Sequence, residues 1–412
     1  MTNQTAFIKK ISVNELVVGM HVKEVCSSWI KSPFWRTSFD LKNKQEIEML
    51  LNSRVKEVWI DTSKSVIEIK KPVDVKEPLE IISKTTTDNE TTERYKVPIE
   101  EELKRASILC SQSKKAVSAM FEEARMGKVV DSGFAQELVQ DITESVTRNP
   151  GALISLARLK SADDYTYMHS VAVCAMMVAL SRKLGLDEEE TRLCGIAGLM
   201  HDIGKVSMPM DLLNKPGKLT NEEFSIIKGH PLEGHKLLLA ASDTPSVVLD
   251  VCLHHHEKID GTGYPYGLKG EDISLHAKMG AICDVYDAIT SNRPYKSGWD
   301  PAESIQKMAQ WTTGHLDPII FQAFVKSIGI YPVGSLVRMT SGRLGIVIDQ
   351  TEKSLTTPII KIFFSTKSGV RIPPQLIDLS KDNESDRIQC REDPSVWKFS
   401  FLNDLWSGGL VK

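Results

Sequence analysis

The sequence predicts a mainly α-helical protein with a small mixed α/β module at its N-terminus and a short β-rich extension at its C-terminus. Three observations predict this. Between residue 98 and about residue 330, apolar residues recur at i, i+3, i+4 and i+7, the spacing of amphipathic helices. At both ends of the chain, short runs of β-branched residues are bounded by turn residues, which favours strands. A polar segment separates the first module from the helices.

Residues 1–70 form the predicted N-terminal module, a regulatory or uncharacterised unit. Its strands are expected at residues 16–22 and 55–60, with a helix at 44–51 between them. Residues 71–98 are expected to form a flexible linker, because the stretch from Thr85 to Thr92 has no apolar side chain to bury.

The helical region divides into connecting helices at 99–148 and a catalytic domain at 149–330. Helices are expected at 99–126, 133–147 and 165–184, and another opens at the acidic run 187–190. That run could bind a metal, but the favourable interaction of carboxylates with a helix N-terminus explains it more simply. The β-rich extension spans 331–412, with strands expected at 335–339, 344–348 and 358–364.

The composition is that of an ordinary globular protein. Of the 412 residues, 41% are hydrophobic and 25% are charged, and the formal net charge is −3. This charge argues against a large surface for nucleic acid polymers, although one basic pocket stays possible. No apolar run approaches the roughly 20 residues of a membrane span, and no signal peptide is visible. The seven cysteines are scattered. We therefore expect no disulfide framework and a cytoplasmic location.

Histidine is concentrated in one part of the chain. Eight of the ten histidines lie between His169 and His276, where an even spread would place two or three. His169 lies on the apolar stripe of its helix, and alone it would be a buried core histidine. The adjacent pair His201–Asp202 ends an apolar helix, with side chains about 100° apart, so both can reach one metal and the carboxylate can bridge two. Gly204 suits a left-handed turn that closes this helix.

Further metal-binding residue types follow at long spacings. His230 begins an apolar stretch, three consecutive histidines (254–256) end another, and Asp284 and Asp287 lie three apart on an apolar helix. Three histidines in a row are hard to explain as core residues, since each would need a buried hydrogen-bond partner. Imidazole and carboxylate without thiolate suit Fe, Mn, Zn or Ni. Six or seven ligands exceed the needs of one catalytic metal. The pattern therefore favours a two-metal site that activates water for attack on a phosphodiester.

These motifs together resemble the HD-GYP phosphodiesterases. The resemblance covers about residues 150–330 and rests on His169, His201-Asp202-x-Gly204-Lys205, His230, His255-His256-Glu257, Asp260-Gly-x-Gly-Tyr-Pro265, Asp284 and Arg293-Pro-Tyr-Lys296. It implies an all-helical domain that hydrolyses a cyclic dinucleotide, either cyclic di-GMP or 3′,3′-cyclic GMP-AMP. A hydroxide bridging two metals would open the ring, and the product would be a linear dinucleotide or mononucleotides.

The resemblance also implies a role for individual residues. Asp202 and Lys205 would be catalytic, with Asp202 bridging the metals and Lys205 contacting the scissile phosphate. Arg293 and Lys296 would hold phosphate or guanine. The loop containing Gly263, Tyr264 and Pro265 would shape the pocket or contact diguanylate cyclase domains. The implied metal ligands are His169, His201, Asp202, His230, His255, His256 and Asp284.

Some members of the family bind a third metal through a Glu one helical turn before the early histidine. Here that position is Tyr165, which favours two metals. Fe or Mn is expected, with Ni and Zn as alternatives. His254 is ambiguous beside its neighbours, whereas His21, His235, His276 and His315 are expected to be structural. Two other functions stay open: a catalytically silent cyclic dinucleotide receptor, and an HD-type nucleotidase.

Overall fold

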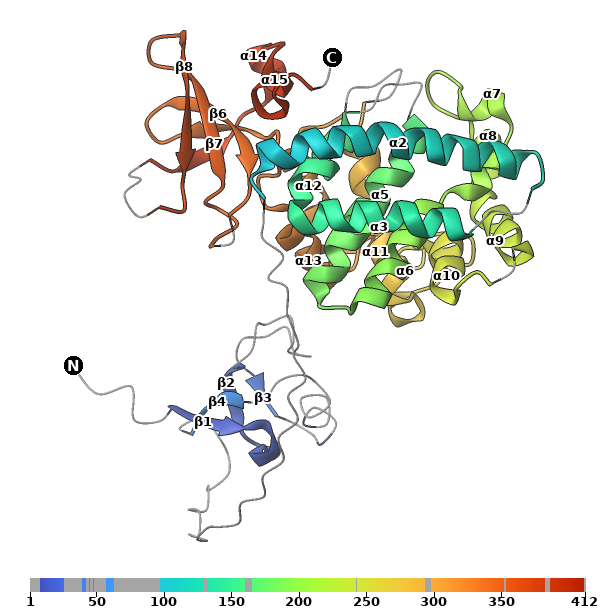
Figure 1. Cartoon of the computed structure of the whole chain (residues 1–412). Coiled ribbons are helices and arrows are strands. Elements are labelled where there is room, and N and C mark those ends of the chain that lie inside the picture. Colours follow the sequence, from blue (N-terminus) through green and yellow to red (C-terminus); the bar gives the residue numbers. More distant parts are fainter. Residues whose placement is uncertain are drawn as a thin grey trace, which may run out of the picture. The chain divides into compact units, whose positions relative to one another are not determined.

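The computed structural model describes residues 8–25, 39–41, 44, 47, 57–62, 97–128, 132–159, 165–241, 243–292, 298–351, 353–381 and 386–410. The chain divides into two compact units, Met1–Thr92 and Glu93–Lys412. The first unit carries a small sheet, and the second combines a helical bundle with another sheet (Figure 1). The predicted fold class is therefore confirmed. Among the described residues, no helix is both long and apolar enough to cross a membrane.

The N-terminal sheet is antiparallel, with its strands in the order β1-β4-β2-β3. The strands are β1 (Ile8–Ser12), β2 (His21–Val25), β3 (Phe39–Asp40) and β4 (Glu57–Asp61). Part of the predicted strand at 16–22 is wrong, because a 3₁₀ turn (η1, Val13–Glu15) and a bend at Gly19, with a φ of 96°, precede β2. A positive φ suits glycine and interrupts a strand. The helix expected at 44–51 falls largely outside the described residues.

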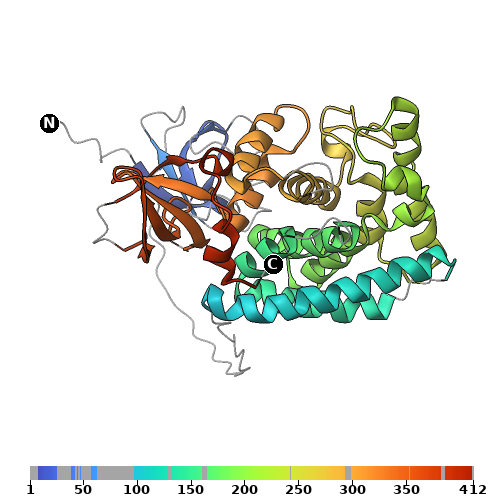
Figure 2. The ribbon, with the colours of Figure 1, turned by 90° about the horizontal axis from the view of Figure 1, so that it is seen from above.

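The second unit is built around the helix α5 (Tyr165–Leu184). This helix contacts α2 (Ile99–Arg125), α3 (Ser132–Arg148), α4 (Pro150–Arg158) and α6 (Glu188–Met200). Every residue from Met168 to Ser181 is buried, which explains why α5 is apolar around most of its circumference. α2 runs along the outside of the bundle (Figure 2). The short α4 was not predicted, although Asn149 and Pro150 form a helix start.

The remaining helices bring the metal-binding motifs around α5 and α6. Asp187 and Glu190 form a capping box at the start of α6, which favours the capping explanation of the acidic run. Both α11 and α13 contact α5. The other elements are η3 (Ile203–Ser207), α7 (Met210–Leu213), α8 (Asn221–Ile227), α9 (His230–Ala240), α10 (Ser246–His254), η4 (Gly270–Asp272), α11 (Leu275–Thr290), α12 (Pro301–Trp311) and α13 (Pro318–Ile328).

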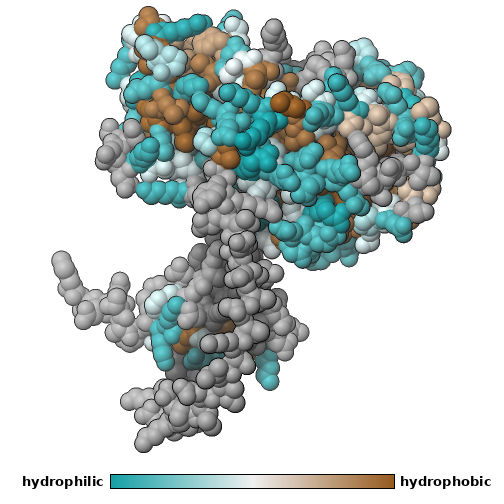
Figure 3. All heavy atoms as spheres, viewed as in Figure 1, coloured by the Kyte–Doolittle hydropathy of each residue, from teal (hydrophilic) through white to brown (hydrophobic). Residues whose placement is uncertain are grey.

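The C-terminal sheet is antiparallel, in the order β8-β7-β6-β5-β9. The three predicted strands are present as β5 (Leu336–Met339), β6 (Arg343–Asp349) and β7 (Ile359–Ser365). The edge strands β8 (Val370–Asp378) and β9 (Ile388–Arg391) were not predicted. β8 is mostly exposed and contains two prolines, which an edge strand tolerates. The short helices α14 (Pro394–Trp397) and α15 (Leu402–Ser407) follow the sheet. Figure 3 shows hydrophobic residues on the surface of this region.

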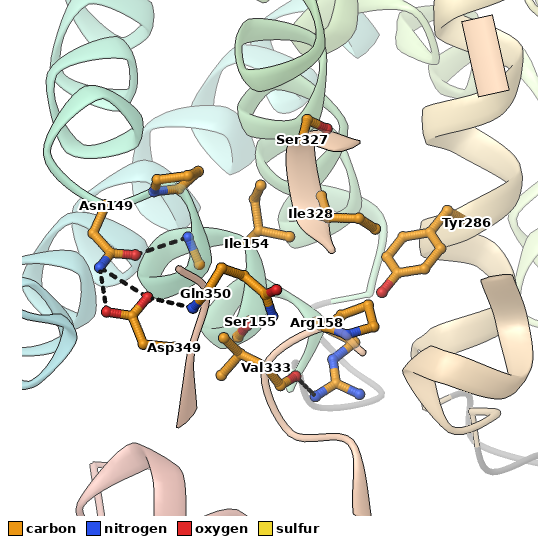
Figure 4. Close-up of a pocket in the computed structure, with 13 residues that line it drawn as sticks. Asn149, Ile154, Ser155, Arg158, Tyr286, Ser327, Ile328, Val333, Asp349 and Gln350 are labelled. Atoms are coloured by element: carbon orange, nitrogen blue, oxygen red, sulfur yellow. Dashed lines mark hydrogen bonds between the residues drawn. The ribbon is translucent and has the colours of Figure 1, made fainter. Parts of the chain in front are cut away.

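A buried amide joins the C-terminal sheet to the helices. The Asn149 side chain accepts a hydrogen bond from the Gly151 N–H (3.0 Å) and donates to the Val97 carbonyl (3.2 Å) and the Asp349 carboxylate (3.3 Å). Beside it lies a cavity of about 50 Å³, into which Arg158 and Tyr286 point (Figure 4). That volume holds only a few water molecules, far less than a nucleotide needs. This cavity therefore lies where the C-terminal sheet packs against the helices, and it is not a nucleotide pocket.

Replacing Asn149 with Ala is expected to lower the free energy of unfolding by about 2–3 kcal/mol. The variant loses the N-cap of α4 and leaves a buried carboxylate without its amide donor. Urea unfolding of the full chain, followed by tryptophan fluorescence, measures the change. The control Asn221→Ala removes an exposed amide on α8 and should stay within about 0.5 kcal/mol of wild type. Equal stability of the two variants would contradict this role for Asn149.

Candidate metal centre

The structure brings all seven predicted metal ligands together, although they come from five parts of the bundle. His169 lies on α5, His201 and Asp202 follow the end of α6, and His230 is the first residue of α9. His255 and His256 follow α10, and Asp284 lies on α11. All are buried except His256, whose side chain is 23% exposed. The site is therefore enclosed, with one side open near His256.

Six of the seven side chains form two groups that share Asp202, and Asp284 lies beside both groups. In the first group, His169 Nε2 lies 3.1 Å from His201 Nε2 and 3.3 Å from Asp202 Oδ2; it also lies 3.1 Å from Asp284 Oδ1. In the second group, Asp202 Oδ1 lies 3.1 Å from His230 Nε2 and 3.8 Å from His255 Nε2. Each oxygen of Asp202 thus faces a different group, which is the arrangement of a carboxylate that bridges two metal ions.

His256 belongs to the second group, and its Nδ1 lies 3.7 Å from Asp284 Oδ2. Asp284 therefore contacts histidines of both groups through different oxygens.

The outer ring nitrogens of three histidines are held by backbone carbonyls. The Nδ1 atoms of His201, His230 and His255 lie 2.8 Å, 2.8 Å and 3.0 Å from the carbonyls of Gly198, Ile227 and Val251. A carbonyl only accepts, so each Nδ1 carries the proton and each Nε2 presents its lone pair inward. The Nε2 atoms of His230 and His255 are 3.4 Å apart. Two facing lone pairs cannot hydrogen-bond to each other, whereas a cation between them would satisfy both.

His169 is oriented by a carboxylate and not by a carbonyl. Its Nδ1 lies 2.7 Å from Asp287 Oδ2, and Asp287 is only 2% exposed. Burial lowers the pKa of His169, but hydrogen bonds to Asp202, Asp284 and Asp287 outweigh burial and raise that pKa to about 10. Three surrounding carboxylates make this position strongly favourable for positive charge. Of the two aspartates of α11, Asp287 is thus the one that orients His169, while Asp284 faces its inner nitrogen.

Asp202 has the character of an ionised metal ligand. It is fully buried, and its Oδ1 has no hydrogen-bond partner among the described residues. Burial raises the pKa of Asp202, but the charge of Lys205 and the contacts with His169 and His201 lower that pKa by more, so the carboxyl is held well below its usual range. A buried charged oxygen without a partner is costly unless a cation binds it. The residues present therefore fit a metal.

Gly204 has a different function from the one predicted. It does not take a left-handed conformation but lies within the 3₁₀ turn η3. A Cβ at this position would lie 1.9 Å from the His230 carbonyl and 2.4 Å from the Gly234 amide nitrogen. Glycine is required here because the backbones of η3 and α9 approach closely. This approach places His230 beside Asp202.

Comparison with known proteins identifies the family. A model of the HD domain matches residues 145–320, and a model of a domain of unknown function (DUF3391) matches residues 8–133. The chain is 50% identical, over 405 residues, to a cyclic di-GMP phosphodiesterase of Pseudomonas aeruginosa, a match that covers 97% of this chain and 96% of that protein. The chain belongs to the HD-GYP family. The predicted family is therefore confirmed.

Other relatives match a shorter part of the chain. A cyclic di-GMP phosphodiesterase response regulator of Xanthomonas campestris is 39% identical over 168 residues, which cover 40% of this chain and 44% of that protein. A 3′3′-cGAMP-specific phosphodiesterase of Vibrio cholerae is 34% identical over 177 residues, covering 43% of this chain and 41% of that protein. The HD domain is a metal-dependent hydrolase fold, in keeping with the two groups of ligands.

The glycine-tyrosine-proline loop of this HD-GYP chain is held by one buried carboxylate. Glu257 is 2% exposed and accepts hydrogen bonds from the N–H groups of Tyr266, Gly267 and Leu268 at 2.8–3.1 Å. The Tyr264 ring lies 4.7 Å from the His256 ring. The loop is therefore fixed beside the metal centre. The sequence analysis placed Glu257 in the family motif without assigning its contacts, which depend on the folded loop.

We expect Glu257→Ala to loosen this loop. Three backbone donors would lose a charged acceptor, at a cost of about 1–3 kcal/mol, so the amides of Tyr266, Gly267 and Leu268 should exchange hydrogen roughly 10–100 times faster. Hydrogen exchange measured by mass spectrometry tests this. Glu271→Ala, which alters a fully exposed side chain in the following turn, is the control. Unchanged protection of the loop in Glu257→Ala would refute the assignment.

The other predicted residues do not join the two groups. His254 turns away and bonds Asp250, with Nδ1 2.8 Å from Oδ1. Among the described residues, His235, His276 and His315 belong to neither group, in keeping with structural roles. Lys205 lies in η3 and pairs with Asp202 Oδ2. Arg293 and Lys296 lie outside the described residues, as does the side chain of Tyr165.

Proposed function

We propose that the protein hydrolyses a phosphodiester bond of a cyclic dinucleotide, either cyclic di-GMP or 3′,3′-cyclic GMP-AMP, to give the linear dinucleotide. The observation that carries the proposal is the pair of ligand groups that share the two oxygens of Asp202. The names of the relatives support this substrate class, since both rings occur among them. Further hydrolysis to mononucleotides would be a second step.

The donor set suits two divalent transition-metal ions, for which Fe or Mn is proposed and Ni or Zn is compatible. His169, His201 and Asp284 would hold one ion, His230, His255 and His256 the other, and Asp202 both. Such ions supply a nucleophilic water at neutral pH and stabilise charge on the phosphate. Imidazole and carboxylate donors without thiolate match these metals.

The protein's own residues would orient the phosphate and its charge. Lys205 pairs with Asp202 and is 23% exposed, so its ammonium group lies between the buried carboxylate and the open side of the site. There it can neutralise negative charge on the scissile phosphate. Burial and the charges of Asp284 and Asp202 raise the pKa of Tyr264, so its hydroxyl keeps its proton and can donate to a phosphate oxygen. Arg293 and Lys296 are proposed to hold phosphate or guanine.

The proposal also covers the loop beside the site, the N-terminal module and the location of the protein. The loop of Gly263, Tyr264 and Pro265 would shape the pocket, and it could also contact diguanylate cyclase domains. Residues 1–70 would serve as a regulatory module. We place the protein in the cytoplasm, where its dinucleotide substrate would be found.

The proposal is tested by anaerobic turnover of cyclic di-GMP and of cyclic GMP-AMP with Mn- or Fe-loaded protein, resolved by chromatography. We expect metal-dependent opening of at least one ring, and the faster substrate identifies the preference. Nucleoside mono- and triphosphates serve as comparison substrates, because an HD-type nucleotidase would prefer them. Absence of ring opening at full metal occupancy would refute the proposal, and tight binding of the ring in that case would indicate a silent receptor.

A further inference from the structure

The end of α8 carries an exposed aromatic ring and a cation on one side of the helix. Phe224 and Lys228 are four residues apart, so their side chains are neighbours on the helix surface. Phe224 is 44% exposed. Lys228 Nζ lies 4.9 Å from the centre of the Phe224 ring and 5.4 Å from that of Tyr264. We call Phe224, Lys228 and Tyr264 the α8 ledge.

The α8 ledge and the residue beside Lys228 contact two of the proposed metal ligands, His256 and His230. The Tyr264 ring lies 4.7 Å from the ring of His256, with 31° between their planes. Phe224 packs edge-on against Tyr264 at 6.4 Å. Ile227, between Phe224 and Lys228, accepts the hydrogen bond from His230 Nδ1 at 2.8 Å. The ledge therefore borders His256, the most exposed of the seven proposed metal ligands.

The charge on Lys228 has no carboxylate partner among the described residues. Nearby lysines do: Lys205 pairs with Asp202, and Lys215 pairs with Glu223 at 2.6 Å. Lys228 instead lies over two aromatic rings, one of them well exposed to solvent. Together they offer a flat apolar surface and a positive charge, which suit a nucleobase and a phosphate.

We propose that the α8 ledge binds the half of the cyclic dinucleotide that lies away from the scissile bond. The inference rests on the proposed function and adds residues that determine substrate specificity. A cyclic dinucleotide has two phosphates and two bases, so with one phosphate at the metal centre the other half needs its own contacts. One nucleobase stacks on Phe224 beside Tyr264, and Lys228 binds the second phosphate.

The test compares two substrates in Phe224→Ala and Lys228→Ala. One is the cyclic dinucleotide that the wild type turns over faster, and the other is bis(p-nitrophenyl) phosphate, a diester without a nucleobase or a second phosphate. We expect the ratio of kcat/KM for the ring to kcat/KM for the small diester to fall about tenfold, mainly through the KM for the ring. Phe224→Trp and Lys228→Arg should restore the ratio. Ile226→Ala, an exposed residue on the same helix two positions along, is the control.

The outcomes distinguish failure of the ledge proposal from failure of the proposed function. If the ratio in both alanine variants equals that of the wild type, the ledge proposal is overturned and ring hydrolysis is unaffected. This holds whether activity is retained or falls equally for both substrates. A ratio that falls equally in Ile226→Ala also overturns it, because the effect would then be general to α8. Wild-type protein that cleaves only the small diester overturns the proposed function and the ledge with it.

Discussion

Replacing Asp202 with Ala should remove most of the bound metal and lower turnover of the cyclic dinucleotide at least about a thousandfold. Asp202 is the one residue that both ligand groups share, and its two oxygens face different histidines. Metal ions stabilise transition-state charge by several kcal/mol, and each ~1.4 kcal/mol corresponds to a tenfold change in rate. Loss of this carboxylate also leaves Lys205 without its ion-pair partner, which adds positive charge where cations must bind.

The Asp202 experiment requires metal analysis together with kinetics. Metal content per protein, measured by mass spectrometry, should fall in parallel with turnover, while circular dichroism should show retained helix. Asp202→Asn preserves the shape of the side chain and separates loss of charge from loss of packing. Asp211→Ala removes an exposed aspartate on α7 and is the matched control. Full activity of Asp202→Ala at equal purity would disprove the metal-centre assignment.

Asp287→Asn should weaken metal binding by about 10–100-fold, although Asp287 is not itself among the predicted ligands. Its carboxylate accepts the proton of His169 Nδ1 at 2.7 Å, so a metal that displaces the Nε2 proton would find the lone pair facing Asp202 and Asp284. An asparagine amide can instead donate to Nδ1, which would move the ring proton to Nε2 and remove the ligand lone pair. Asp287 thus acts through His169 as a positioning residue.

Competition with a chelator of known affinity measures this effect directly, and a structural defect alone would not reproduce it. Ser291→Ala is the control, because Ser291 donates to the other oxygen of Asp287 at 3.1 Å, and not to the oxygen that faces His169 Nδ1. We expect its metal affinity to stay within a few-fold of wild type. Wild-type affinity in Asp287→Asn would show that the carboxylate does not set the state of His169.

Much of the helical bundle could be predicted because its pattern is local. The helices at 99–125, 132–148 and 165–184 agree with the predicted ones to within a residue or two. For the first two, burial of one face requires a period near 3.6. The edge strand β8 could not be predicted in this way. It is largely exposed, so it has no alternation of buried and exposed residues to detect.

The three consecutive histidines illustrate the limit of spacing within the site. Residue type alone could not separate His254 from His255 and His256. In the structure each residue along α10 turns by about 100°, so His254 points to Asp250 while the next two reach the ligand groups. The direction of each side chain depends on where the helix ends and on what packs beside it.

The sequence by itself determined the family and the chemistry of the site, because donor type belongs to individual residues: imidazole and carboxylate recur in a fixed order, without thiolate. Only the tertiary structure decided how these donors divide their roles. Asp202 faces both groups, Asp287 orients His169 across 118 positions of sequence, and Gly204 permits a contact between two backbones. These roles depend on distances of about 3 Å between segments far apart in the chain, and packing of the helices sets those distances.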